Sequence, residues 1–226
     1  MGGSSFEVES VSNILSCKTL TLLKLTCLVI KEDIPQISVS SIKTLHLDKI
    51  LFMSQDRLSF FSVFPNLEDL HANDVFVVGG RQYIPQTEEI KAMNKCLPKL
   101  VMANAGNMEL IPFFSVSREL ILNVDQTLRY VMVQVPIFYN LTQLELLFNF
   151  NESWKAEWKW RWTIKMLQHS PKLQHLIIHQ KNEIGTDENN WEEPNIIPEC
   201  LSSELKTFTA VAAIAVVAMR NAVIAA

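Results

Sequence analysis

Glycine is scarce in this sequence, and so are the motifs that depend on it. The 226 residues include six glycines, with no glycine-rich phosphate loop and no GxSxG turn to present a nucleophilic serine. The HExxH pattern of zinc peptidases is absent as well. We therefore expect no catalytic residues, no cofactor and no metal ion, and we interpret the chain as a non-enzyme.

Cysteine pairs and concentrated charge are also lacking. The four cysteines form no CxxC pair, so we expect reduced thiols and a cytoplasmic or nuclear protein. Residues Met1 to Val8 show no basic stretch followed by an apolar run, which argues against a secretory signal. The net charge of −4 has mixed signs, whereas a nucleic-acid partner calls for a concentrated basic face.

The sequence does not contain a run that could span a membrane. Its apolar stretch Ala210 to Met219 is interrupted after ten residues by Arg220 and Asn221, and a spanning helix needs about 20. We expect this stretch to be buried as a cap over the end of the fold. No membrane partner is predicted.

A leucine spacing, LxxLxL, recurs along most of the chain. In the clearest copy, Leu144 and Leu146 are two residues apart and face the same side of a strand, because strand side chains alternate with that period. The eight copies, of which the fifth and eighth are weaker, begin at Leu20, Ile42, Leu67, Leu97, Ser117, Leu141, Leu173 and Leu205.

Intervals of 20 to 32 residues between copies are typical of leucine-rich repeats. The predicted fold class is therefore α/β: a leucine-rich-repeat solenoid with parallel strands on its concave face and helices or irregular segments on its convex face. The alternative is an ordinary α/β domain, because any leucine-rich chain contains some copies by chance.

A helix is predicted after residue 151, where three tryptophans recur at helical spacing at Trp154, Trp158 and Trp162. Pro171 ends it. Basic residues lie between the tryptophans, which would also suit a membrane surface or a nucleic-acid groove. Acidic neighbours reduce that charge, so we expect the tryptophans to pack against the strands.

Four stretches of the sequence resemble one protein family. Residues 16–25 read SCKTLTLLKL, residues 41–52 SIKTLHLDKILF, residues 64–70 FPNLEDL and residues 191–208 WEEPNIIPECLSSELKTF. In this order and spacing they resemble the leucine-rich part and the opening of the FBD domain in the plant family of F-box/FBD/leucine-rich-repeat proteins. The resemblance covers about residues 11 to 209 and implies irregular leucine-rich repeats at 16–190 and a partial FBD-like domain, followed by the apolar tail, at 191–226. The polar composition of residues 1–15 predicts a disordered segment there.

Members of that family look like substrate receptors of SCF-type ubiquitin ligases, in which an F-box docks on the adaptor subunit and the repeats hold a protein target. The resemblance thus implies a protein–protein interaction module. No F-box-like segment precedes Val11, so we expect the adaptor subunit to bind only if an F-box is supplied. The alternatives are a leucine-rich scaffold or inhibitor unrelated to ubiquitin, and a truncated product without function.

The side chains that alternate with the inward leucines are predicted to line the concave face, which such arrays use for partners. They are Lys24, His46, His71, Glu145 and Ile177. The alternative is that these side chains are merely solvated. His175 and His179, four residues apart on one strand, would be about 13 Å apart and too distant to share a metal ion.

Overall fold

The structure, a computed structural model, describes residues 17–30, 38–53, 57–77, 87–106, 108–124, 135–148, 156–180 and 198–211. The predicted segment 1–15, the start of the FBD-like run and the apolar tail beyond residue 211 lie outside these ranges. The division of the chain into three parts therefore remains a prediction.

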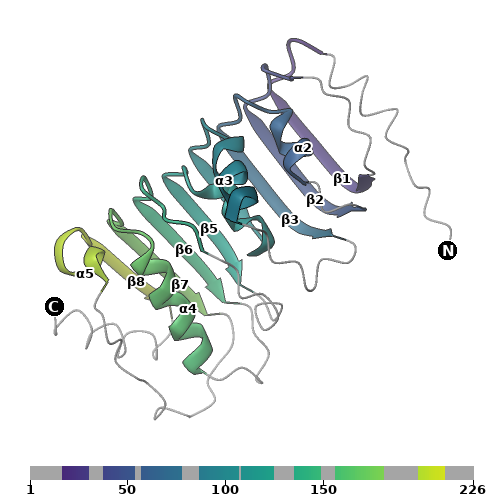
Figure 1. Cartoon of the computed structure of the whole chain (residues 1–226). Helices are drawn as coiled ribbons and strands as arrows, with labels where there is room; N and C mark the ends of the chain where they lie inside the picture. Colours follow the sequence, from purple (N-terminus) through teal and green to yellow (C-terminus); the bar gives the residue numbers. More distant parts are fainter. Residues whose placement is uncertain are drawn as a thin grey trace, which may run out of the picture.

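Eight parallel strands form one open sheet, in which each strand pairs with the next along the chain (Figure 1). The strands are β1 (Leu22–Ile30), β2 (Thr44–Phe52), β3 (Asp69–Val77), β4 (Met102–Ala105), β5 (Glu119–Val124), β6 (Gln143–Phe148), β7 (His175–Gln180) and β8 (Thr207–Val211). A parallel sheet in strict sequence order is what stacked repeats produce. The predicted α/β leucine-rich-repeat solenoid is confirmed.

The helices lie together on one face of this sheet (Figure 1). They are α2 (Arg57–Ser62), α3 (Thr87–Cys96), the 3-10 helix η2 (Met108–Phe114), α4 (Ala156–Gln168) and α5 (Glu199–Ser203). Side chains from all five belong to the same buried cluster as the inward side of the strands. As predicted, a helix precedes Pro171, and Trp162 packs against this core. Trp154 and the side chain of Trp158 lie outside what the structure describes.

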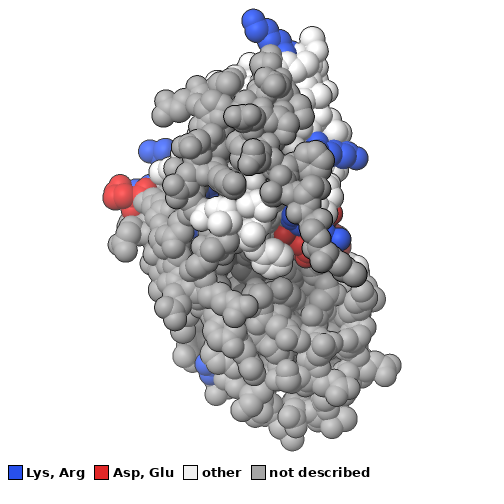
Figure 2. Space-filling model, turned by 90° about the vertical axis from the view of Figure 1, so that its right-hand side faces the viewer, with Lys and Arg blue, Asp and Glu red and all other residues white. Residues whose placement is uncertain are grey.

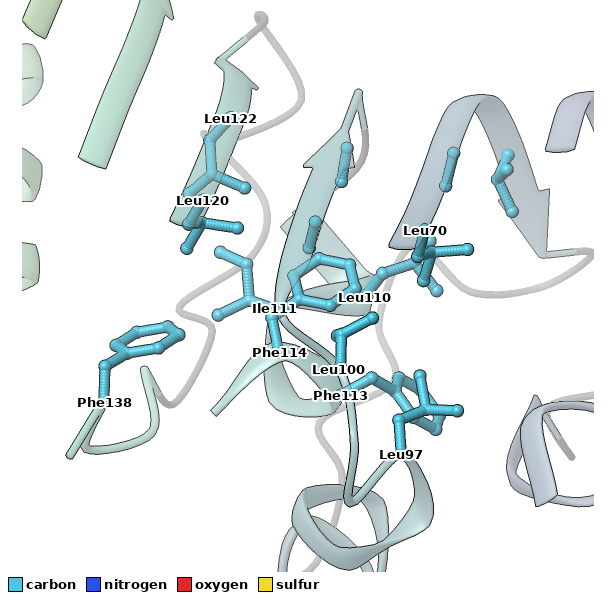
Figure 3. Packing of buried hydrophobic residues seen from close by; sticks show 14 of the residues in the cluster. Leu70, Leu97, Leu100, Leu110, Ile111, Phe113, Phe114, Leu120, Leu122 and Phe138 are labelled. Atoms are coloured by element: carbon cyan, nitrogen blue, oxygen red, sulfur yellow. The ribbon is translucent and has the colours of Figure 1, made fainter. Parts of the chain in front are cut away.

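The inward side chains form rows that cross the sheet from strand to strand. One row contains register partners Leu23, Leu45, Leu70, Ala103, Leu120, Leu144, Leu176 and Phe208. The members from Leu45 to Leu176 have no exposed surface. Figure 3 shows Leu70 and Leu120 beside Ile111 and Phe114 of η2, so the helices complete the core that the strands begin.

The fourth leucine copy was placed three residues too early. The register aligns Ala103 with Leu70, so the copy begins at Leu100 rather than Leu97, and Met102 faces away from the core. The physical reason is a proline turn, in which the Leu100 amide donates to the Leu97 carbonyl at 3.2 Å. Proline at the second position favours such a turn. The Leu67 and Leu173 amides each donate the equivalent hydrogen bond, also at 3.2 Å.

A ladder of hydrogen bonds to backbone carbonyls fixes this register where the strands begin. In each repeat one carbonyl accepts hydrogen bonds from two consecutive amides of the next repeat, beginning with the Thr21 carbonyl and ending with that of Gln174. In the fourth repeat the donors are Val101 and Met102, at 2.7 and 3.1 Å from the Glu68 carbonyl oxygen. A copy that began at Leu97 would need Pro98 as a donor, and proline has no amide hydrogen.

Replacing Leu144 by Ala should lower the free energy of unfolding by about 2 to 5 kcal/mol, because a fully buried leucine leaves a cavity. The matched control is Leu147→Ala on the same strand, whose side chain faces the opposite side and is only half-buried. Chemical denaturation of both variants provides the measurement. Equal losses, or a loss below about 1 kcal/mol for Leu144→Ala, would contradict the assignment of the two faces.

Candidate interaction face

The face of the sheet opposite the helices, which we call the open face, carries the side chains that alternate with the core. Its middle row crosses all eight strands in register and consists of Lys24, His46, His71, Asn104, Ile121, Glu145, Ile177 and Thr209. All are exposed or half-buried. The structure therefore brings the five residues predicted from the sequence into this single row.

Asn104, Ile121 and Thr209, the other members of the middle row, were not predicted from the sequence. Asn104 was missed because the fourth copy was assigned three residues too early, and that error moved Met102 to the core. The fifth and eighth copies, which supply Ile121 and Thr209, have the weakest leucine spacing. The proline at position 98 was the sequence signal that could have corrected the start of the fourth leucine copy.

Two histidines of the middle row, on β2 and β3, lie against one another. The ring centroids of His46 and His71 are 4.4 Å apart and the rings are tilted by 33°. The pKa of His46 lies below its ordinary value of 6.5, first because the imidazole is partly buried and then because His71 and Lys24 oppose a further positive charge; Asp69 acts in the opposite sense. The uncharged form of His46 is therefore favoured.

The two histidines of β7 have polar partners instead. His179 Nε2 lies 3.0 Å from Glu145 Oε1, across the strand pair β6–β7. His175 Nδ1 lies 2.7 Å from the Thr207 hydroxyl on β8. Four of the five histidines in the sequence thus lie on the open face. Within the described ranges, no three His, Cys, Asp or Glu residues are placed to hold a metal ion.

A bulge shared by β1, β2 and β3 changes the open face near the ends of these strands. Cys27, Lys49 and Asp74 have φ angles of 56°, 53° and 47°, which non-glycine residues rarely adopt and which cost about 1 to 2 kcal/mol each. All three lie between the same two rows of register pairs, so the bulges are aligned. Each inserts one extra residue between consecutive core positions.

Beyond the bulge the alternation of buried and exposed side chains resumes. Ile30, Ile50 and Val75 are buried, so the residues next to them in each strand, Val29, Leu51 and Phe76, face the open side; these three are register partners. We call these three residues the apolar row. Phe76 is 52% exposed. The sequence pattern that could have predicted the apolar row is the spacing of inward apolar residues in each strand, which are three apart at the bulge, as in Leu47 and Ile50, instead of two.

Charge on the described surface is mixed. The open face carries Lys24, Asp48, Asp69, Glu119 and Glu145. In the view of Figure 2 the described basic and acidic residues are interspersed, and neither sign forms a continuous patch. Among the described residues, the open face thus carries charges of both signs.

The four thiols differ in environment. Cys17 and Cys27 are exposed, and hydrogen bonds with Thr19 hold the pKa of Cys17 below its ordinary value of 9.0. Burial raises the pKa of Cys96 to about 12 and that of Cys200 to about 11. All four cysteines are free of disulfides.

Of the helices in the described part of the chain, none has the length and apolar character needed to cross a membrane.

Comparison with known proteins finds relatives in Arabidopsis thaliana. One, an F-box/FBD/LRR-repeat protein, is 31% identical over 87% of this chain and 52% of the relative. Another with the same description is 25% identical over 91% of this chain and 54% of the relative. An FBD-associated F-box protein is 26% identical over 87% of this chain and 53% of that protein. The chain thus spans about half the length of these relatives. No family model and no solved structure matches it.

The lowered pKa of His46 predicts a loss of stability on mild acidification. Below pH 6.5 the unfolded chain protonates this imidazole before the folded chain does, so the free energy of unfolding falls as pH decreases from 6.5 toward the folded pKa. In the variant His46→Asn this contribution should disappear. Urea denaturation between about pH 7.5 and pH 5.5, where carboxylates stay ionised, measures it. An unchanged pH dependence in the variant would contradict the assignment.

Proposed function

This chain belongs to the plant family of F-box/FBD/LRR-repeat proteins, and from that membership we propose that it is a protein-interaction module that recognises a target for an SCF-type ubiquitin ligase. The target is held on the open face. Transfer of ubiquitin is carried out by other subunits, and this chain binds rather than catalyses. The adaptor subunit is recruited by an F-box where one is supplied, not by the sheet.

The observation that carries this proposal is the open face itself. Eight strands at a spacing of about 4.8 Å make a surface about 34 Å from β1 to β8, which suits a protein partner. The described helices all pack on the opposite face, so they leave this surface uncovered. Its mixture of histidine, amide, carboxylate and aliphatic side chains offers hydrogen bonds and apolar contacts together.

The experiment compares two matched double variants. Asn104→Arg with Ile121→Arg places bulky side chains at the centre of the open face, and Glu88→Arg with Lys91→Arg places them on α3, where both residues are exposed. A partner captured from plant extract by the unmodified chain is purified, and its affinity for all three proteins is measured by calorimetry. Circular dichroism verifies that both variants are folded.

We expect the open-face variant to lose at least about tenfold in affinity, about 1.4 kcal/mol, and the α3 variant to stay within about twofold. The reverse pattern would place the partner on the helical side and end the proposal. Equal affinity for all three proteins would also contradict it, because a large partner could not avoid the centre of the sheet.

A further inference from the structure

At the β1–β3 end of the open face, the middle row begins with four hydrogen-bond donors. Lys24, His46, His71 and Asn104 are consecutive register partners on β1 to β4. Lys24 and His71 are close enough to His46 to oppose its protonation. Three nitrogen bases crowded in one row disfavour a second and third positive charge unless an anion is bound among them.

The histidines of this row differ from those of β7 in their partners. His179 and His175 contact Glu145 and Thr207, whereas within the described residues His46 and His71 interact with each other and with nearby charges. Imidazole nitrogens at a half-buried position gain from a polar acceptor. The β2–β3 pair is therefore the part of the row that an external acceptor would complete.

The same three strands carry the apolar row of Val29, Leu51 and Phe76. It lies five residues further along each strand than Lys24, His46 and His71, which we call the donor row, or at most about 16 Å at 3.3 Å per residue. An exposed phenylalanine beside two aliphatic side chains on a rigid sheet is a contact surface for a bulky apolar side chain. The shared register holds the two rows at a constant separation.

We propose, building on the function proposed above, that the β1–β3 end of the open face binds a protein segment in which an Asp or Glu carboxylate and a bulky apolar side chain are about 16 Å apart or less. The carboxylate accepts hydrogen bonds from Lys24, His46 and His71. The apolar side chain lies on the apolar row. The distance between the carboxylate and the apolar side chain of the partner segment is therefore what the two rows recognise.

The charges around the donor row make this binding depend on pH. Asp48 and Asp69 lie two residues along their strands from the two histidines, so with Lys24 they place one net negative charge around the neutral His46. Protonation of His46 cancels this net negative charge. Lys49 and Asp74, exposed at the bulge, add one charge of each sign. A carboxylate partner therefore binds more tightly as the pH falls toward 5.5.

The probe is a displayed library of random peptides 12 residues long, panned on the complete chain near pH 5.5. We expect selected peptides to be enriched in Asp or Glu together with Phe, Leu or Trp, and to bind about tenfold more tightly near pH 5.5 than near pH 7.5. In NMR titrations the bound peptide should raise the pKa of His46. Enrichment in Lys or Arg, or no peptide bound at β1–β3, overturns the proposal.

Matched variants separate the contribution of each row. His46→Asn with His71→Asn should remove the pH dependence of peptide affinity, while His175→Asn with His179→Asn on the same face should keep it. Phe76→Ser should weaken binding about tenfold at both pH values. Retained pH dependence in the first variant refutes the carboxylate contact. If the peptides bind instead at β5–β8, this proposal fails while open-face binding stands; if they bind on α3, both fail.

Discussion

The whole array depends on keeping consecutive repeats in phase. Each strand must present two inward side chains at the height of those on its neighbours, because a shift by one residue would turn its apolar set toward water. Two features enforce the phase: the stacked leucines, such as Leu45 and Leu70, and the carbonyl ladder, in which each repeat supplies two amides to the previous one. Burial of the leucines lowers the free energy of the folded state, and the carbonyl ladder selects one register among those that bury leucine.

The open face inherits its order from that register. Rows such as Lys24, His46 and His71 exist because residues 22 and 25 apart in sequence are register partners. The aligned bulges at Cys27, Lys49 and Asp74 extend the same phase by one residue, and they turn a phenylalanine on β3 outward. Surface residues that are far apart in the sequence therefore lie in rows, because the packing of the core fixes the register of the strands.

Most of the fold could be predicted from the leucine spacing, since it depends on a local period of two within each strand. Seven of the eight copies were assigned correctly, and even the weak copy at Ser117 forms β5. The fourth was wrong because Leu97 satisfies the spacing yet belongs to a proline turn. Contacts between repeats, such as that of the His46 ring with the tilted His71 ring, could not be foreseen, because they depend on the length of the loops between strands.

The carbonyl ladder is the feature that distinguishes this register most directly from the alternatives, and amide hydrogen exchange measured by NMR tests it. We expect slow exchange at both donor amides of the second to eighth repeats, including Val101 and Met102 in the fourth, at rates close to those of Lys43 and Thr44 in the second. Exchange at Val101 and Met102 as fast as at exposed amides, with the other donors protected, would contradict the register and the rows on the open face that follow from it.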